Sequence, residues 1–177
     1  MNHADLVRAA AAWAKKRYPV VITEVSSSGR ETPDVLAFGN RFSTLIECKA
    51  SRSDFLADQQ KYFRRTIDFG MGRRRYYCAP TGLLKPDEMP NQWGLIEVGK
   101  NGKARIVKDS GVYSVWSAAN ETQVLISVLR RLAITEHPGV SIRCYTHQTK
   151  CTATVSIDRD LPRDTCTSLR PRNKQKS

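Results

Sequence analysis

The order of hydrophobic and polar positions predicts a helix, three strands, a second helix and a fourth strand. An alanine-rich stretch near the start has the character of a helix, and β-branched or apolar runs follow it. A helix between two strands joins them in parallel, whereas a hairpin pairs them antiparallel, so we expect a mixed sheet. The predicted elements are a helix over 4–17, strands over 20–25, 34–38 and 43–50, a helix over 53–69 and a strand over 75–79.

Two more strands and a last helix are predicted after this core. Residues 93–98 and 104–108 flank the turn residues 99–103, which predicts a hairpin. Apolar residues at helical spacing predict a helix over 118–133, whose apolar side chains serve packing. These side chains are Val124, Leu125, Val128, Leu129 and Leu132.

Length and composition favour one domain. A chain of 177 residues with a 40% hydrophobic share can bury one sizeable core. We expect that domain over residues 1–135, followed by a C-terminal extension over 136–177 that ends in a partly disordered basic tail. The fold class expected is therefore α/β, with an αβββαβ core, a mixed sheet flanked by helices, and an added hairpin and helix.

Two charged residues interrupt the strand predicted over 43–50. Side chains two apart on a strand point to the same face, so Glu47 and Lys49 share a face. Ile46, Cys48 and Ala50 fall on the opposite face, where they suit a hydrophobic core. The strand can therefore be buried and still present two charges.

Asp34 opens the preceding strand, and Gly39-Asn40 predicts a turn that folds this strand back beside Glu47. Two neighbouring carboxylates repel each other unless a cation lies between them. Mg²⁺ prefers oxygen ligands and keeps several waters, so Asp34, Glu47 and the backbone carbonyl of Cys48 are candidate ligands, with Mn²⁺ as a substitute. A simpler alternative is a solvated Glu47–Lys49 pair on an edge strand, with Asp34 as an ordinary turn residue.

These residues resemble the PD-(D/E)XK nuclease superfamily, which has the restriction-endonuclease-like fold. Over about residues 3–110 the chain is also similar to the MmcB-like DNA repair proteins. The segments that carry the likeness are Thr23-Glu24-Val25, the Ser-rich turn to Gly29-Arg30, Pro33-Asp34, Glu47-Cys48-Lys49-Ala50-Ser51, Ser53-Asp54-Phe55-Leu56-Ala57-Asp58, Tyr76-Tyr77-Cys78-Ala79-Pro80-Thr81-Gly82 and Trp93-Gly94-Leu95-Ile96-Glu97-Val98.

The resemblance implies that Asp34, Glu47 and Lys49 are the core catalytic residues, and it makes Glu24 a candidate additional metal ligand. In that interpretation the metal lowers the pKa of a bound water, and Lys49 orients or helps deprotonate this water and stabilises charge on the phosphate. Gln59 is a candidate for placing water or phosphate, although an exposed helical glutamine is the simpler expectation.

The chain is strongly basic, with a formal net charge of +12 and a pI near 9.8, which favours a polyanionic partner. Basic residues concentrate over 61–75, and arginines suit phosphates while exposed tyrosines can stack on unpaired bases. The alternative is a solvated helix face with the aromatic residues in the core. Leu56, Phe63 and Ile67 have the spacing of a buried stripe on the predicted 53–69 helix, which would leave the arginines exposed. The candidate nucleic-acid-binding residues are Arg64, Arg65, Arg73, Arg74 and Arg75.

Cysteine content and hydropathy bear on the location. No stretch approaches the ~20 apolar residues of a membrane span, so we expect a cytoplasmic protein with no membrane partner. Five cysteines, an odd number, favour free thiols in a reducing compartment. The residues His137, Cys144, His147 and Cys151 form a weak alternative zinc quartet that lacks a CxxC pair.

The leading hypothesis is a Mg²⁺-dependent DNA endonuclease or DNA-repair nuclease that hydrolyses phosphodiester bonds. RNA stays open as a substrate, and pairing into a homodimer stays open because nucleases of this fold often pair. The alternative is a catalytically inactive nucleic-acid-binding module on the same scaffold, since its charge would be identical. A ribosomal or RNA-structural protein would explain the charge but not the spacing of Asp34, Glu47 and Lys49.

Overall fold

The computed structural model describes residues 1–28 and 31–132. The predicted αβββαβ order is confirmed, as are the added hairpin and last helix. The helices are α1 (His3–Lys15), α2 (Arg52–Gln59), α3 (Tyr62–Arg65) and α4 (Ala118–Leu132), with the 3-10 turns η1 (Ile67–Phe69) and η2 (Pro86–Glu88). The strands are β1 (Val20–Thr23), β2 (Val35–Phe38), β3 (Ser43–Cys48), β4 (Arg74–Pro80), β5 (Gly94–Val98) and β6 (Ala104–Lys108).

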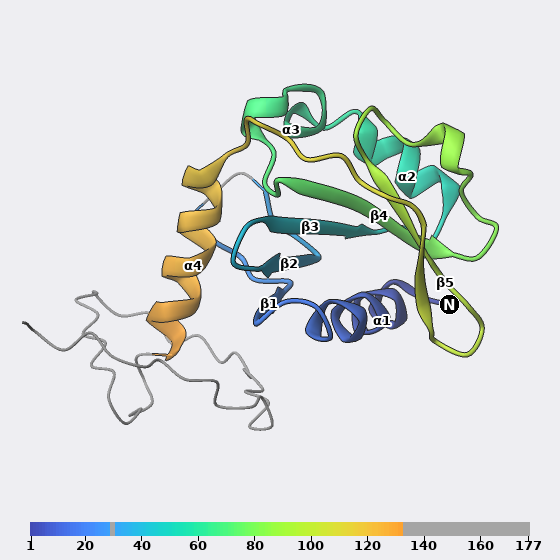
Figure 1. Cartoon of the computed structure of the whole chain (residues 1–177), viewed down its shortest axis with the longest axis horizontal. Coiled ribbons are helices and arrows are strands. Elements are labelled where there is room, and N and C mark those ends of the chain that lie inside the picture. Colours follow the sequence, from blue (N-terminus) through green and yellow to red (C-terminus); the bar gives the residue numbers. More distant parts are fainter. Residues whose placement is uncertain (29–30, 133–177) are drawn as a thin grey trace, which may run out of the picture. The chain divides into compact units, whose positions relative to one another are not determined.

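The strands form one mixed sheet in sequence order, β1 to β6 (Figure 1). Two antiparallel hairpins join β1 to β2 and β2 to β3, and a third joins β5 to β6. The pairs β3–β4 and β4–β5 are parallel. The connection from β3 to β4 carries α2 and α3, as expected for a parallel crossover. The predicted α/β class is therefore confirmed.

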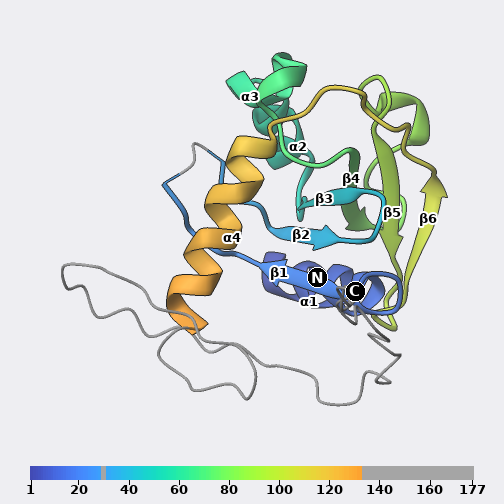
Figure 2. The same cartoon turned by 60° about the vertical axis from the view of Figure 1, so that its left-hand side comes forward.

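Helix α1 covers one face of the sheet, and α2 and α3 lie over the other (Figures 1 and 2). Asn2 caps α1, because its side chain accepts a hydrogen bond from the Asp5 amide while the Asp5 carboxylate accepts one from the Asn2 amide. The α1 side of the core brings Leu6 and Trp13 of the helix onto Ile46 and other strand residues. The face of β3 that was predicted to meet the core therefore does pack against α1.

The opposite face of the sheet is equally closed. Leu45 and Tyr77 extend from the sheet on this side, and Phe55 of α2 and Val124 of α4 pack in the same hydrophobic cluster. All six residues of β3 are buried, so this strand lies inside the molecule on both faces. The side chains of Glu47 and Lys49 are therefore held between the sheet and the crossover helices.

The single helix predicted over 53–69 is wrong. The segment breaks into α2, α3 and η1, and Leu56 and Ile67 are 50% and 49% exposed instead of forming a buried stripe. If the helix were continuous, the six positions from Asp58 to Arg64 would turn the Arg64 side chain about 240° around the helix axis. The two side chains would then point away from each other. The break at Lys61, which has extended backbone, allows Arg64 to turn back onto Asp58.

Helix α4 has the predicted position and packs partly as expected. Val124 is buried, and Leu125 and Val128 pack against the same core. Leu129 is 46% exposed, so its predicted packing role is wrong. The buried carboxylate of Glu121 anchors this helix by accepting hydrogen bonds from the Ser43 hydroxyl and the Gly72 amide.

Several predictions concern residues outside the described part of the chain. These are the extension over 136–177, its boundary with the domain, and the zinc quartet His137, Cys144, His147 and Cys151. Within residues 1–28 and 31–132, no helix combines the length and apolar character needed to cross a membrane. Cys48 and Cys78 are free thiols buried in the core.

The corrected packing of α2 can be tested with two neighbouring residues. Phe55→Ala should lower the free energy of unfolding by about 3–5 kcal/mol, because it empties a buried site against Tyr77. Leu56→Ala should change it by no more than about 0.5 kcal/mol, because that side chain is half exposed. Urea unfolding measures both values, and a larger loss for Leu56→Ala would contradict this packing.

Candidate active site

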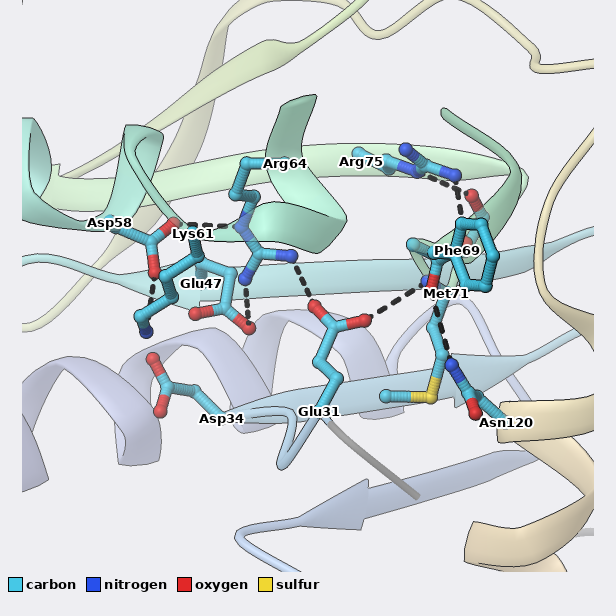
Figure 3. Close-up of polar contacts among 12 residues, drawn as sticks. Glu31, Asp34, Glu47, Asp58, Lys61, Arg64, Phe69, Met71, Arg75 and Asn120 are labelled. Atoms are coloured by element: carbon cyan, nitrogen blue, oxygen red, sulfur yellow. Dashed lines mark hydrogen bonds and ion pairs between the residues drawn. The ribbon is translucent and has the colours of Figure 1, made fainter. Parts of the chain in front are cut away.

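The β2–β3 hairpin brings Asp34 and Glu47 together, as predicted. Val35 pairs with Ile46, so continuing this antiparallel register by one residue places Asp34 opposite Glu47. The Asp34 Oδ2 atom accepts a hydrogen bond of 2.7 Å from the Cys48 amide, which fixes the carboxylate beside β3. Figure 3 shows the Asp34 and Glu47 carboxylates on the same side of the sheet.

Lys49 shares a face with Glu47, which was also predicted. Its Nζ atom lies 3.4 Å from Glu47 Oε2 and 3.1 Å from Asp58 Oδ1. Glu47 and Lys49 are each 3% exposed, and β3 lies in the interior of the sheet. The alternative of a solvated pair on an edge strand is therefore wrong.

Burial raises the pKa of the two facing carboxyls. For Glu47, desolvation is the largest cause; Arg64 opposes it and the Asp34 charge reinforces it. For Asp34, desolvation again dominates and outweighs the stabilising hydrogen bond from the Cys48 amide. Both ions are thus held in an environment that disfavours their negative charge.

Asp58 and Lys49, in contrast, favour their charged forms. Burial opposes ionisation of Asp58, but Arg64 and Lys49 outweigh it and hold the Asp58 pKa well below its usual range. Burial also opposes the charge on Lys49, yet the Glu47 and Asp58 carboxylates raise the pKa of its ammonium group. Lys49 is consequently a charged donor at neutral pH, which suits charge stabilisation and water orientation better than deprotonation.

Arg64 is not a surface residue, so its prediction as a nucleic-acid contact is wrong. Its guanidinium, whose side chain is 4% exposed, lies between three carboxylates (Figure 3). Nη2 is 3.0 Å from Glu47 Oε1, Nε is 2.7 Å from Asp58 Oδ2, and Nη1 pairs with Glu31. Trp93 lies under the same guanidinium, 5.2 Å from the ring centroid. These partners explain why Arg64 points inward.

Sequence reasoning missed Glu31 and Asp58, which are each 1% exposed. Glu31 pairs with Arg64 and accepts a 3.0 Å hydrogen bond from the Met71 amide. Asp58 accepts hydrogen bonds from Arg64 and the Tyr77 hydroxyl, and it pairs with Lys49 and Lys61. Asp58 lies three residues after buried Phe55 on α2, which is a helical signal for a shared face. Nothing in the periodicity around Glu31 marks it.

The prediction that Arg75 contacts nucleic acid is also wrong. Arg75 is 1% exposed, and its guanidinium donates to the carbonyls of Gly72, Ile67 and Gly70. Its Cζ atom also lies 4.1 Å from the centroid of the Tyr113 ring. The hydrogen bonds of Arg75 therefore link the start of β4 to η1 and the loop that follows it.

The other three predicted contacts differ in exposure. Arg73 is half-buried between the rings of Phe42 and Trp116, and Arg74 lies 3.2 Å from Asp109. Arg65 is exposed on α3. Contact with nucleic acid stays a prediction for all three, and Arg65 is the most accessible of them.

The edge of the site near Asp34 reaches solvent. The His3 Nε2 atom lies 3.4 Å from Asp34 Oδ1 and 3.8 Å from Glu24 Oε1, and the Glu24 side chain is 58% exposed. Glu24 follows β1 with a left-handed backbone, φ 49°, which ends the strand before it. Gln59 is the last residue of α2 and is half-buried. The roles of Glu24 as a metal ligand and of Gln59 in placing water or phosphate stay predictions.

A divalent cation at this site stays a prediction, and Asp34 and Glu47 are its candidate side-chain ligands. Among the described residues, no group of three or more His, Cys, Asp or Glu side chains is arranged to hold a metal. Asp34 and Glu47 nevertheless form a pair of carboxylates, and the Cys48 side chain packs in the opposite core. The role of the Cys48 backbone carbonyl as a ligand stays a prediction. Within the described chain, buried Glu47 Oε1 accepts no hydrogen bond, although it forms an ion pair with Arg64 Nη2 at 3.0 Å.

The balance of charges in the site bears on the predicted cation. Four carboxylates face three basic side chains, so the ionised cluster carries an excess negative charge that a cation would reduce. The carboxylates are Glu31, Asp34, Glu47 and Asp58, and the basic side chains are Lys49, Lys61 and Arg64. A cavity of about 570 Å³ beside α1 and the β5–β6 turn is lined by none of these residues.

The structure is similar to a solved structure, the SPO1766 protein of unknown function from Silicibacter pomeroyi. The TM-score is 0.59 and the identity 21%, over 80% of this chain and 97% of that chain. No protein-family model matches the chain. No curated protein matches it either. The similarity shows the fold alone, so membership of the MmcB-like or PD-(D/E)XK proteins stays a prediction.

The opposite pKa shifts of Asp34 and Asp58 predict opposite effects of neutralising each residue. Ionised Asp34 opposes folding because burial raises its pKa, so Asp34→Asn should raise the thermal midpoint at pH 7 by a few degrees. This gain should shrink as the pH falls through the raised pKa, where wild-type Asp34 becomes protonated, and should be gone below the ordinary aspartate pKa of about 4.

Asp58→Asn should instead lower the stability at pH 7 by about 3 kcal/mol, because it leaves Arg64 and Lys49 without a buried counter-ion. The stabilisation from Asp58 is present above its ordinary pKa and is lost only in strong acid, as the pH falls toward its lowered value. Thermal unfolding across pH measures both variants. Shifts of the same sign at pH 7 would contradict this electrostatic description.

Proposed function

We propose that this protein is a metal-dependent DNA nuclease that hydrolyses phosphodiester bonds. The observation that carries the proposal is the placement of Asp34 opposite Glu47 on one hairpin, with the Lys49 ammonium 3.4 Å from Glu47 on the same strand face. Two carboxylates and a protonated lysine, all poorly solvated, form a set suited to metal-assisted hydrolysis. We also propose that the chain belongs to the PD-(D/E)XK nucleases, which its site residues resemble.

Each residue of the site has a distinct proposed role. Asp34, Glu47 and the Cys48 carbonyl would hold Mg²⁺, which when bound supplies an acidified water and neutralises phosphate charge. Lys49 orients the attacking water and stabilises the negative charge that develops on the phosphate oxygens. Asp58 and Arg64 are positioning residues, because Asp58 holds the Lys49 ammonium and Arg64 contacts Glu47.

Substrate access is proposed on the side of Asp34. The Asp34 side chain is 17% exposed, whereas those of Glu47 and Lys49 are 4% exposed. His3 and Glu24 lie at the same edge and are more exposed still. The net charge of +12 favours DNA as the partner, and a cytoplasmic location agrees with the two buried free thiols.

One observation favours a second function, an inactive nucleic-acid-binding module. Arg64 already lies 3.0 Å from Glu47, so the protein itself supplies a cation to one of the two proposed metal ligands. A binding module, however, gains nothing from the Asp34 carboxylate near phosphates, because it repels them unless a metal is bound. Cleavage therefore separates the two functions.

The nuclease proposal predicts loss of cutting from conservative changes in the site. Glu47→Gln and Lys49→Met keep side-chain size, and each should reduce cleavage of labelled DNA in Mg²⁺ or Mn²⁺ by at least about a hundredfold. The substrate panel contains single-stranded, duplex and branched DNA and a single-stranded RNA. Folding of each variant is checked by its thermal midpoint.

Glu97→Gln is the matched control. Glu97 is also a buried carboxylate on a strand, but it binds Arg105 and the Gly82 amide outside the proposed site. This variant should cut like the wild type. Absence of cutting by the wild type on every substrate would favour the binding module instead. Full activity in Glu47→Gln would contradict the catalytic role proposed for Glu47.

A further inference from the structure

Two aromatic rings are exposed on the segment formed by α3 and η1. Tyr62 is 55% exposed and Phe69 42%, and their ring centroids lie 5.2 Å apart at an angle of 54°. Tyr76 and Tyr77, which follow the same basic stretch, are buried in the core. Tyr62 and Phe69 are therefore rings of this stretch whose faces can meet a ligand.

Positive charge accompanies these rings. Lys61, which precedes α3, and Arg65, its last residue, are exposed, while Asp68 is the exposed acid in the same segment. Lys61 also lies 2.7 Å from Asp58, one of the residues that holds Lys49. The same helical turn directs Arg64 into the site, so the exposed rings adjoin the proposed catalytic network.

We propose that Tyr62 and Phe69 form a stacking surface for unpaired bases of single-stranded DNA, with Lys61 and Arg65 contacting the backbone. Every base has a π face, so such stacking tolerates any sequence. The faces of paired bases are covered by their neighbours in a duplex, and only unpaired nucleotides can insert onto the rings. This inference rests on the proposed function and names its substrate class, DNA with unpaired nucleotides.

The charges disfavour a second copy of this chain as the occupant of these rings. A two-fold symmetric contact brings the same surface of both copies together, and on each copy the exposed cations Lys61 and Arg65 outnumber the exposed acid Asp68. Bases linked by phosphates supply both an apolar face and the opposite charge. The surface therefore fits a single strand of nucleic acid better than it fits itself.

The test is equilibrium binding measured by fluorescence anisotropy in EDTA, where metal-dependent cutting does not occur. The probes are a labelled oligothymidylate of about 20 nucleotides, which is longer than the usual site of a single-strand binding surface, an oligouridylate of the same length and a duplex of the same length. Tyr62→Ala and Phe69→Ala should each weaken oligothymidylate binding by about fivefold or more. Duplex binding should change by less than about twofold.

Two variants serve as controls. Tyr62→Trp should retain oligothymidylate binding because it keeps an aromatic face, and Leu56→Ala should have no effect because it removes an equally exposed side chain that has no ring. Thermal midpoints should be unchanged in all variants, since these side chains are exposed.

Equal weakening of oligothymidylate and duplex binding, or an effect of Leu56→Ala as large as that of the rings, would overturn the inference. Binding of an oligouridylate without binding of oligothymidylate would overturn the assignment to DNA. Loss of a dimer in size-exclusion chromatography with unchanged DNA binding would assign the rings to self-association. A ring effect without cutting contradicts only the nuclease proposal, and cutting without a ring effect contradicts only this inference.

Discussion

The charges buried between the sheet and the crossover helices constrain the rest of this structure. Glu31, Glu47, Lys49, Asp58 and Arg64 are almost completely removed from water, and an isolated charge in such a place costs several kcal/mol. Each charge therefore requires a partner of opposite sign at close range. Arg64 meets this requirement for three carboxylates at once, and it is the centre of the network in Figure 3.

This pairing explains local features that otherwise look irregular. The crossover segment breaks after α2, which allows Arg64 to reach Asp58 and leaves Tyr62 and Phe69 on the surface. The same network keeps Lys49 protonated, while burial raises the pKa of Asp34 and Glu47. A site whose facing carboxylates are held at a cost to stability is expected where function, and not folding, has selected them.

The sheet was largely predictable from the sequence, because alternation along a strand is a local signal. The faces of β3, the hairpin that brings Asp34 to Glu47 and the hairpin of β5 with β6 all followed from residues close together in the chain. The catalytic candidates could be predicted for the same reason. Lys49 lies two residues from Glu47, and a turn of a few residues connects their strand to that of Asp34.

Which arginine side chains are buried could not be predicted in this way. Arginine is usually exposed, and the burial of Arg64 and Arg75 depends on partners that are distant in sequence, such as Glu31 and Tyr113. The role of Asp58 likewise required the position of Tyr77 on a later strand. Local periodicity carries no information on such pairs, so it predicted one long helix where the chain breaks and Arg64 pairs with Glu31, Glu47 and Asp58.

The central claim is that Asp34 and Glu47 together bind a divalent metal, and anomalous diffraction from Mn²⁺-soaked crystals tests it most directly. We expect an anomalous peak between these two carboxylates, within bonding distance of an oxygen of each, and no such peak in Asp34→Asn crystals. Wild-type crystals in which Arg64 stays beside Glu47 and no peak forms between the carboxylates would contradict the claim.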